Sequence, residues 1–574
     1  MEEFVFGTLA TIEKRVAYLK ERQRGVKHLH RLQPRAPRAG ESPVVTVTVE
    51  TARAIERVEC VVSEPDTAVI PLILYKNEWD VLNWAYIETW QAALPPRPDG
   101  TLVRYRIRAI PADGSAPIWA DDGATFSYLV GDPAQPEWAR SAIVYQIFPD
   151  RFYPGDGRNW NEVTNLNDIY GGTLRGIIQK LDYVAEMGFN AIWLNPFFPD
   201  DNTHHGYHAT DYFNVNPRLG SLDDVRELVQ AAHERGIRLI LDFVANHWSS
   251  EHKTFQEAVR HPDSEFVAWY HWIDYPDDYE TFFGVMTLPQ VNVDHPQVRD
   301  YLLRSAQFWL GEVGFDGLRL DYALGPSHDF WTELRRAAKS VKPDAWLFGE
   351  VVETPETILS YEGRLDGCLD FPLAQAFRDV FALERMNLAA FDHFLAQQDA
   401  FYPAAFSRPT FLDNHDMNRF YWLTGEDKRK LKLAALCQFT LTGQPIVYNG
   451  TEVGVHQEKG MGEAGSQGMV EGRQPMLWGE AQDGELREYF RWLIQLRRKH
   501  PVFWRGERQT VHLDAAAGMY VYVRYDMGEV VFVGLNLSEE RQVVTAVFSH
   551  NGHAIEHTFT LDAWSGDAVV VSRS

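Results

Sequence analysis

The sequence predicts an α/β protein: a (β/α)8 TIM barrel with a small inserted domain, flanked by N-terminal and C-terminal β-sandwich domains. Three observations favour this fold class. The chain has 574 residues, enough for three or four domains at ~150 residues each. Its middle alternates short apolar segments with amphipathic helical segments, the pattern of a parallel sheet with crossover helices. Both ends place apolar residues at every second position, which is typical of antiparallel strands with one solvated face.

The N-terminal domain is expected over residues 1–135, and it begins with a helix. Leu9, Ile12, Val16 and Leu19 recur at helical spacing, which predicts an amphipathic helix over about 8–24. The basic stretch that follows is interpreted as a solvated linker. Apolar and polar residues alternate from Val44 onward and again around residue 105, so residues 40–130 are expected to form the first sandwich.

Three tryptophans of this domain leave two interpretations open. Trp79, Trp84 and Trp90 lie close together in the sequence. They belong either to the core of the sandwich or to a surface that faces a sugar or a protein partner, because large aromatic rings serve both purposes.

The barrel is expected over residues 136–500. Its eight candidate strands are residues 142–147, 191–195, 239–244, 317–320, 346–349, 367–370, 410–412 and 446–448. Helices are expected near 174–187, 222–234, 297–310 and 328–339. A doubly wound open sheet is the structural alternative, but no GxGxxG turn follows the first strand. The aromatic and acidic segment over about 248–296, after the third strand, is too long for a simple connection and predicts the inserted domain.

The C-terminal domain is expected over residues 501–574. The period of two returns in YVYVRY (520–525) and in EVVFVGLNL (529–537). This alternation predicts a second β-sandwich.

Charge, hydropathy and cysteine usage exclude several classes of partner. The formal charge is −25, so no nucleic-acid partner is expected. Mean hydropathy is −0.32 and no apolar run of ~18 residues occurs, so no membrane span is expected. The N-terminus lacks the pattern of a signal peptide. The three cysteines are far apart and form neither a zinc spacing nor a disulfide framework, which favours the cytoplasm.

Polar residues that carry chemistry follow the predicted barrel strands. Asp242, Asn246 and His247 end the third strand, Arg319 and Asp321 the fourth, Glu350 the fifth, and His415 and Asp416 the seventh, while Tyr207 and Asp211 follow the second. The carboxyl ends of barrel strands open on one mouth, so these side chains are expected to converge there. A lone acid at a strand end is more often a helix cap or turn residue, an interpretation that stays open for Asp211 and Asp242. It does not explain three acids together with an arginine and two histidines.

The blocks LILDFVANH, GFDGLRLDYA, WLFGE and TFLDNHD, in this order, resemble the α-amylase superfamily, glycoside hydrolase family 13. The resemblance covers about residues 140–500. VYQIFPDRF, LPQVN (288–292) and RQPMLW (473–478), with the preceding β domain, are most similar to the branch of cyclomaltodextrinases, maltogenic amylases and neopullulanases.

The resemblance implies a role for each residue of the mouth. Asp321 is the nucleophile, Glu350 the general acid/base, and Asp416 holds the 2- and 3-hydroxyls of the sugar and distorts its ring. His247 and His415 bind hydroxyls of the same sugar, Tyr207 stacks on it, and the remaining substrate-binding or supporting residues are Asp211, Asp242, Asn246, Arg319 and Arg473.

The chemistry accounts for these residue types. Breaking an acetal needs a proton for the leaving oxygen and an anion for the oxocarbenium-like carbon. Arg319 projects from the same strand face as Asp321 and is expected to keep the pKa of that carboxyl low. Glu350 needs a raised pKa, and its apolar neighbours suit that requirement.

The implied activity is hydrolysis, with retention, of α-1,4-glucosidic bonds in cyclodextrins, maltooligosaccharides or pullulan through a covalent glycosyl-Asp intermediate. Cleavage of α-1,6 bonds stays open, and no cofactor is required. An α-amylase, an α-glucosidase or a 4-α-glucanotransferase acting on starch-derived glucans is the alternative. A non-catalytic glucan-binding relative is disfavoured because all three acids are present.

Two stretches depart from the pattern of the branch. Leu324 and Gly325 stand after the nucleophile where a more polar stretch ending in an acid is expected, which affects the acceptor side. Met469 stands where an acid is expected before the block that begins at Arg473, which affects the distant glycone side.

A calcium site and a homodimer are the remaining expectations. Asp150, Asp156, Asn159 and Asn161 in the loop after the first strand offer oxygen ligands suited to Ca²⁺, and a polar turn is the equal alternative. The resemblance also implies a homodimer formed through the N-terminal domain, which narrows the cleft and favours small or cyclic oligosaccharides.

Overall fold

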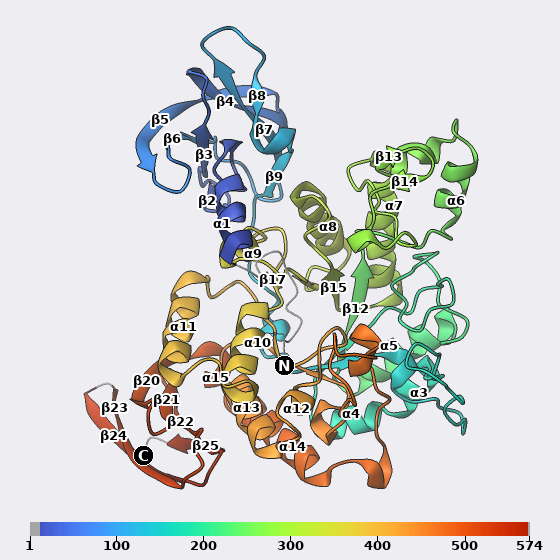
Figure 1. The fold of residues 1–574 in the computed structure, drawn as a ribbon, viewed down its shortest axis with the longest axis vertical. Coiled ribbons are helices and arrows are strands. Elements are labelled where there is room, and N and C mark those ends of the chain that lie inside the picture. The colour runs from blue at the N-terminus through green and yellow to red at the C-terminus, as the bar shows by residue number, and fades with distance from the viewer. Residues whose placement is uncertain (1–11, 551, 572–574) are drawn as a thin grey trace.

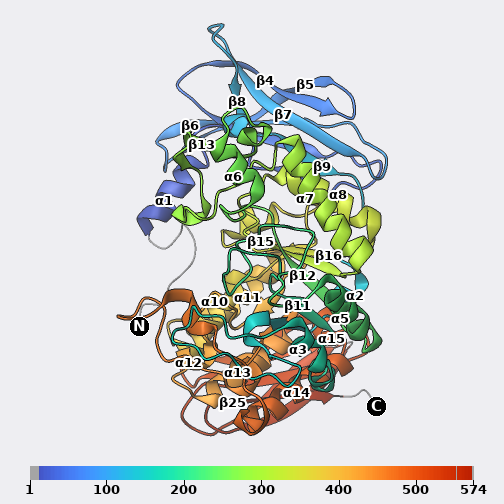
Figure 2. The ribbon, with the colours of Figure 1, turned by 90° about the vertical axis from the view of Figure 1, so that its right-hand side faces the viewer.

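The computed structural model describes residues 12–550 and 552–571 and confirms the predicted architecture, an α/β barrel flanked by antiparallel strands. The N-terminal strands lie at one end of the molecule and the C-terminal strands at the other (Figures 1 and 2). No helix in these residues is long and apolar enough to cross a bilayer.

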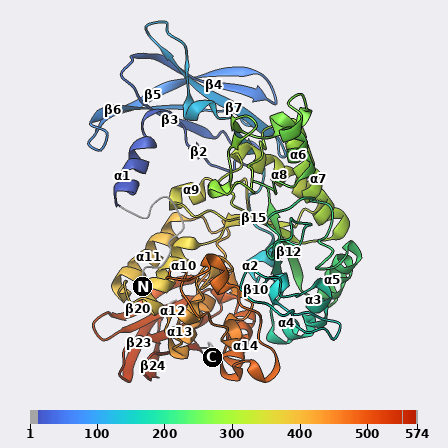
Figure 3. The same ribbon diagram turned by 45° about the vertical axis from the view of Figure 1, so that its right-hand side comes forward.

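The first helix ends earlier than predicted, at Glu21 instead of about residue 24. Leu9 lies outside the described residues, and α1 spans Ile12–Glu21. Tyr18 and Arg22 bind the hydroxyl of Thr357 in α9 (Pro355–Leu359), so α1 lies beside α9 (Figure 3). This contact places the N-terminal helix over the loop that follows the fifth barrel strand.

The N-terminal β domain contains nine strands. They are β1 (Gly25–Lys27), β2 (Leu32–Gln33), β3 (Val44–Glu50), β4 (Ile55–Glu64), β5 (Ala68–Asp80), β6 (Ala85–Ala93), β7 (Leu102–Pro111), β8 (Ile118–Trp119) and β9 (Phe126–Leu129). Their order is β1-β3-β6-β5-β4-β7-β8, with β2 on β3 and β9 on β7. One apolar core joins side chains of β3 with side chains of β4 and β7. Strand β3 is hydrogen-bonded to neither of these two strands. The continuous sheet therefore folds over its own apolar face.

The three tryptophans divide between the two interpretations. Trp90 is buried in this core, whereas Trp79 and Trp84 are exposed and pack edge to face with each other. The sequence could not separate them, because β5 and β6 extend beyond the part of the sheet that the core covers.

The N-terminal domain docks on α8 (His328–Val341), the helix after the fourth barrel strand. Arg104 of β7 forms ion pairs of 2.8 Å with Asp329 and 2.6 Å with Glu333. Ser127 of β9 donates a hydrogen bond of 2.9 Å to Thr332. These contacts fix the domain beside the barrel mouth.

All eight predicted barrel strands form. They are β10 (Val144–Ile147), β11 (Ala191–Leu194), β12 (Arg238–Val244), β15 (Gly317–Asp321), β16 (Trp346–Gly349), β17 (Gly367–Cys368), β18 (Thr410–Phe411) and β19 (Pro445–Tyr448). Their order is β17-β16-β15-β12-β11-β10-β19-β18, and neighbours pair in parallel. A parallel bridge between Gly367 and Ser407, just before β18, closes the ring. A Cβ on Gly367 would lie 1.9 Å from the Ser407 carbonyl oxygen, so this closure requires glycine.

The outer helices connect these strands. They are α2 (Glu137–Arg140), α3 (Leu174–Gln179), α4 (Leu181–Met187), α5 (Leu222–Glu234), α7 (Pro296–Gln307), α10 (Phe371–Phe377), α11 (Leu388–Phe401), α12 (Phe420–Leu423), α13 (Lys428–Thr440), α14 (Gly484–Lys499) and α15 (Val502–Arg505). The helix expected near 174–187 is divided at Lys180 into α3 and α4. Ser221 and Asp224 form a capping box that begins α5.

The segment between β12 and α7 is only partly regular. It contains α6 (Lys253–Arg260), a short hairpin of β13 (Trp272–Asp274) and β14 (Asp278–Tyr279), and a 3-10 turn at Phe282–Gly284. It stands beside α7 on the side of the N-terminal domain (Figure 1).

The C-terminal strands form two small antiparallel sheets. They are β20 (Glu507–Asp514), β21 (Met519–Tyr525), β22 (Val530–Asn536) and β25 (Ser565–Val571) in one sheet, and β23 (Gln542–His550) and β24 (His553–Leu561) in the other. The two enclose one apolar core. The Tyr522 hydroxyl bonds Thr440 of α13 at 2.5 Å, which joins this domain to the barrel.

Candidate active site

A single buried guanidinium organises the acids of the barrel mouth. Arg319 and Asp321 lie two residues apart on β15 and so point to the same side of the strand. Arg319 Nη1 donates to Asp242 Oδ1 at 2.7 Å and to Asp321 Oδ1 at 2.8 Å. Its Nη2 lies 2.8 Å from Glu350 Oε2. Three carboxyl groups from three strands therefore meet at one cation.

The contacts distinguish the two oxygens of Asp321. Oδ1 is held by Arg319. Oδ2 is buried and accepts no hydrogen bond from the described residues of the chain. Glu350 Oε2 is also occupied, because it pairs with Arg319 and accepts the Tyr322 N–H at 3.0 Å. One oxygen of each acid is thus anchored, and the other is left for chemistry.

Burial shifts the titration of this cluster. It raises the pKa of Asp321 well above its usual range and raises that of Glu350, although the charge of Arg319 opposes both shifts. The expectation that Arg319 keeps the Asp321 pKa low is therefore wrong for the free enzyme, because sequence gave no measure of burial. Burial also raises the pKa of Asp242 against Arg319. These acids share one cation, so they titrate as one coupled set.

The pKa of Asp416 shifts in the opposite direction to those of Asp321 and Glu350. Burial disfavours its charge, but His415, Arg473 and Arg319 lower its pKa below the usual value. Arg473 Nη2 donates to Asp416 Oδ1 at 2.7 Å, and His415 Nε2 lies 3.0 Å from Oδ2. Arg473, predicted on the strength of the RQPMLW block, is thus brought to the mouth.

Tyr207, Asp242 and His415 form a second set of contacts. The Tyr207 hydroxyl donates to Asp242 Oδ2 at 2.8 Å and lies 2.6 Å from His415 Nε2. The two rings are parallel, with centroids 5.5 Å apart. Burial lowers the pKa of His415 to about 3, so its imidazole is neutral at pH 7. Asp242 therefore holds the side chains of Arg319 and Tyr207 in place.

His247 and Asn246 lie on the side of the inserted segment. The His247 ring packs on Phe282 with centroids 4.5 Å apart, and burial lowers its pKa to about 3. Phe282 and Phe283 also pack edge to face on Tyr322, the residue after Asp321. The rings of this aromatic cluster were not predicted as site residues, although the aromatic composition of 248–296 indicated a functional segment.

The departure at Leu324 and Gly325 has a packing reason. A Cβ on Gly325 would lie 1.8 Å from the side-chain oxygen of Asn246. Asn246 thus touches the loop that follows the nucleophile, and a side chain at position 325 would displace the Asn246 amide.

Asp211 does not join the site. Its carboxylate accepts hydrogen bonds from the Phe213 backbone N–H at 2.9 Å and from the Asn214 side chain at 2.6 Å. This is an Asx turn, so the geometry favours the turn interpretation over a substrate contact.

The expected calcium ligands are partly engaged in other contacts. Asp150 pairs with Arg151 and accepts the backbone N–H groups of Tyr170 and Gly171. Asp156 accepts from Gln179 at 2.8 Å, and Asn161 donates to the Ile169 carbonyl. Asp150, Asn159 and Asn161 share a cavity of about 230 Å³, but two arginines also line it. Among the described residues no group of three His, Cys, Asp or Glu side chains is arranged to hold a metal.

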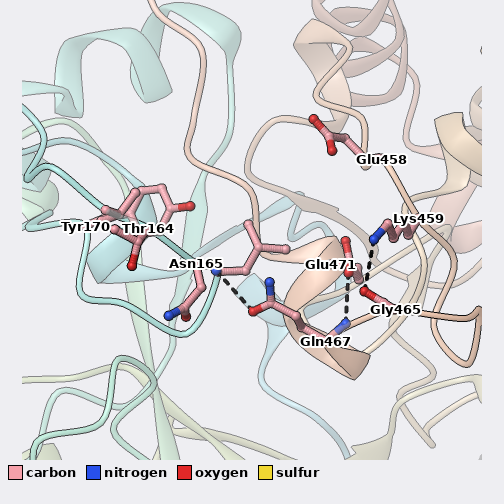
Figure 4. A pocket seen from close by; sticks show the side chains of 10 residues that line it. Thr164, Asn165, Tyr170, Glu458, Lys459, Gly465, Gln467 and Glu471 are labelled. Atoms are coloured by element: carbon pink, nitrogen blue, oxygen red, sulfur yellow. Dashed lines mark hydrogen bonds between the residues drawn. The ribbon is translucent and has the colours of Figure 1, made fainter.

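A second cavity, of about 250 Å³, lies between the loops after β10 and β19 (Figure 4). Glu471 lines it and accepts the Gln467 backbone N–H. It stands two residues before Arg473, so an acid does precede this block although Met469 replaces the expected one. Glu471 was not predicted as a site residue.

Comparisons with known proteins agree with this fold. The model of the alpha amylase catalytic domain matches residues 146–497. Alpha-amylase 2 of Dictyoglomus thermophilum is 37% identical over 418 residues, which are 73% of this chain and 72% of that protein. A cyclomaltodextrinase of a Bacillus species is 35% identical over 421 residues, 70% and 73% of the two chains. The solved structure of a cyclomaltodextrinase superposes with a TM-score of 0.70 at 27% identity and covers 95% of this chain and 99% of its own.

Proposed function

Since this chain belongs to the α-amylase family and is a glycoside hydrolase of that family, we propose that it hydrolyses α-1,4-glucosidic bonds with retention, through a covalent glycosyl intermediate on Asp321. One observation carries the proposal. Asp321 and Glu350 each have one oxygen anchored at Arg319, and Asp321 Oδ2 is left without a partner among the described residues.

The two acids divide the reaction. Glu350 gives its proton to the glycosidic oxygen, and the bond from that oxygen to the anomeric carbon breaks. Asp321 Oδ2 forms the new bond to the same carbon and neutralises the oxocarbenium-like charge. Water then gives a proton back to Glu350 and attacks the anomeric carbon, which releases Asp321 and leaves the sugar with its original configuration.

The other residues bind the sugar in the −1 position. Asp416, ionised beside Arg473, accepts from the 2- and 3-hydroxyls. His415 and His247 are neutral and serve as hydrogen-bonding groups rather than as acids. Tyr207 offers its ring to the apolar face of the sugar. Asp242 keeps Arg319 and Tyr207 in place.

The substrates we propose are cyclodextrins, maltooligosaccharides and pullulan. Two observations support this choice: a relative and a structural neighbour are named cyclomaltodextrinase, and an aromatic cluster of Phe282, Phe283 and Tyr322 flanks the mouth. Starch is the competing substrate, because the 37% identical relative is named an alpha-amylase. Initial rates on γ-cyclodextrin, maltotriose, pullulan and soluble starch distinguish them, and a preference for starch would replace our choice.

Retention is tested separately by ¹H NMR. The reducing sugar released first should be the α-anomer, with β-anomer appearing only at the rate of mutarotation. Initial release of β-anomer would mean inversion and would remove Asp321 as nucleophile.

The partner we propose is a second copy of this chain, bound through the outer face of β5 and β6. Ile73, Trp84 and Tyr86 are 77%, 76% and 63% exposed there, and Val69, Tyr75, Trp79 and Val81 extend the patch. Trp79 packs against Trp84 and Tyr86, and exposed apolar side chains that gather in this way are typical of a protein interface. Light scattering should give twice the 65.8 kDa chain mass for the native protein and the single mass for Trp84→Asp. Val547→Asp, at an exposed valine of β23, is the control; a native monomer would refute the dimer.

The compartment we propose is the cytoplasm. Cys60, Cys368 and Cys437 are free and buried, and an oxidising compartment favours paired cysteines instead. Cell fractionation tests this placement, and recovery of the native protein outside the cytoplasm would contradict it.

A further inference from the structure

The amide of Gln146, on β10, contacts two groups at the centre of the barrel. Its Nε2 lies 2.9 Å from Asn195 Oδ1 and 2.9 Å from His415 Nδ1. All three side chains are buried. Neither glutamine nor asparagine was predicted as a site residue, although both stand in barrel blocks of the sequence.

The orientation of Asn195 follows from its other contacts. Its Nδ2 lies 3.2 Å from Asp242 Oδ2 and 2.9 Å from the Tyr207 hydroxyl. A carboxylate only accepts hydrogen bonds, so Asn195 must present its NH2 group to Asp242. Its carbonyl oxygen therefore faces Gln146, and Gln146 must present an N–H in return.

The second N–H of Gln146 then points to His415. A nitrogen that receives an N–H must offer a lone pair, so Nδ1 of His415 carries no proton. Since burial lowers the pKa of this histidine to about 3, the ring is neutral and holds its single proton on Nε2. The Nε2 atom lies 2.6 Å from the Tyr207 oxygen, which accepts its hydrogen, and 3.0 Å from Asp416 Oδ2.

We propose that Gln146, itself oriented by Asn195, is a positioning residue that fixes His415 as the Nε2–H tautomer. The proposal rests on the proposed function, because its consequence lies in sugar binding. With the proton on Nδ1, Nε2 would turn a lone pair toward the Asp416 carboxylate at 3.0 Å, and two acceptors at that distance repel each other. The fixed tautomer lets Nε2–H donate to the Tyr207 oxygen and keeps a lone pair from facing the Asp416 carboxylate.

Gln438 is a matched control for a merely structural role. It is also a buried glutamine of the barrel, and its Nε2 also contacts two acceptors, the Thr410 carbonyl at 2.9 Å and the Ile446 carbonyl at 3.1 Å. Neither acceptor belongs to the mouth. Gln438→Met therefore removes the same kind of amide without touching His415.

The experiment combines neutron diffraction with kinetics on maltotriose. In the native crystal, deuterium should be found on Nε2 of His415 and not on Nδ1. Gln146→Met should lower kcat/KM about 10- to 100-fold, as expected when a buried acceptor, here Nδ1 of His415, loses its donor. Gln438→Met should lower kcat/KM less than threefold, although the two variants should lose Tm equally. Gln146→Glu places an acceptor against Nδ1 and should add a new inflection to the kcat/KM–pH profile, because His415 then holds a proton there.

Three results would overturn the proposal: deuterium on Nδ1 in the native protein, an unchanged pH profile in Gln146→Glu, or an equal loss of kcat/KM in the two methionine variants. Failure of the proposed function is distinguishable. A native enzyme that hydrolyses no α-glucan would refute that function, while the proton positions would still be read from the crystal.

Discussion

Replacing Glu350 by glutamine tests the division of labour between the two acids. Glu350 Oε2 is occupied by Arg319 at 2.8 Å and by the Tyr322 N–H at 3.0 Å, so only Oε1 is left to carry the proton. Glutamine fills the same space and removes that proton. We expect kcat/KM on maltotriose to fall about 10²- to 10⁴-fold, the contribution of a general acid, or ~3–5 kcal/mol of barrier.

The leaving group decides whether this explanation is correct. Fluoride departs without a proton, so kcat/KM of Glu350→Gln on α-maltosyl fluoride, which reports formation of the glycosyl enzyme, should stay within about tenfold of the native value. The later hydrolysis of the glycosyl enzyme lacks its base, so kcat should fall. Azide should restore turnover of Glu350→Ala by attacking the glycosyl enzyme, and the product should be α-maltosyl azide. Rates are followed with a fluoride electrode and by chromatography. Equal losses on maltotriose and on the fluoride would refute the assignment of Glu350 as the acid.

Three further predictions concern stability and the loop after the nucleophile. Burial lowers the pKa of His28 to about 3, so below pH ~6.5 the unfolded chain binds a proton that the folded chain does not. His28→Gln should therefore reduce the loss of unfolding free energy between pH 6.5 and 5 by about 1.7 kcal/mol in total, and an unchanged pH dependence in urea melts would contradict this. Arg104→Met removes the ion pairs to Asp329 and Glu333 on α8 and should lower the free energy of unfolding by ~2 kcal/mol. A Tm within about 1 °C of the native value would argue against docking of the N-terminal domain through these charges. Gly325→Ala brings a methyl group to 1.8 Å from the Asn246 oxygen and should lower kcat at least about tenfold with the helix content unchanged by circular dichroism; native kcat would show that the loop yields freely.

The barrel could be predicted because its signal is local. Each strand is a short apolar run, and each reactive residue stands where such a run ends, as with Asp321 after GLRL. The break at Lys180 could not be predicted, because α3 and α4 continue one apolar pattern. The different fates of Trp84 and Trp90 likewise depend on how far the core extends under the sheet.

The site likewise has features that the sequence predicts and features that it does not. Arg319 was predicted beside Asp321 from the period of the strand, and the structure places it there. The direction of the Asp321 pKa was not predictable, because it depends on burial by segments distant in the sequence. Gln146 and Asn195 were missed because a neutral amide in a buried strand carries no chemical signal of its own. Only their contacts with His415 and Asp242 show what they orient.

Trapping the intermediate tests the central claim most directly. The native enzyme is incubated with 5-fluoro-α-maltosyl fluoride, digested with pepsin and analysed by tandem mass spectrometry. The account predicts a single fluoroglycosyl group on the carboxyl of Asp321, absent from Asp321→Asn. A label on Glu350 or Asp416, or turnover of the reagent with inversion and no labelled peptide, would contradict it.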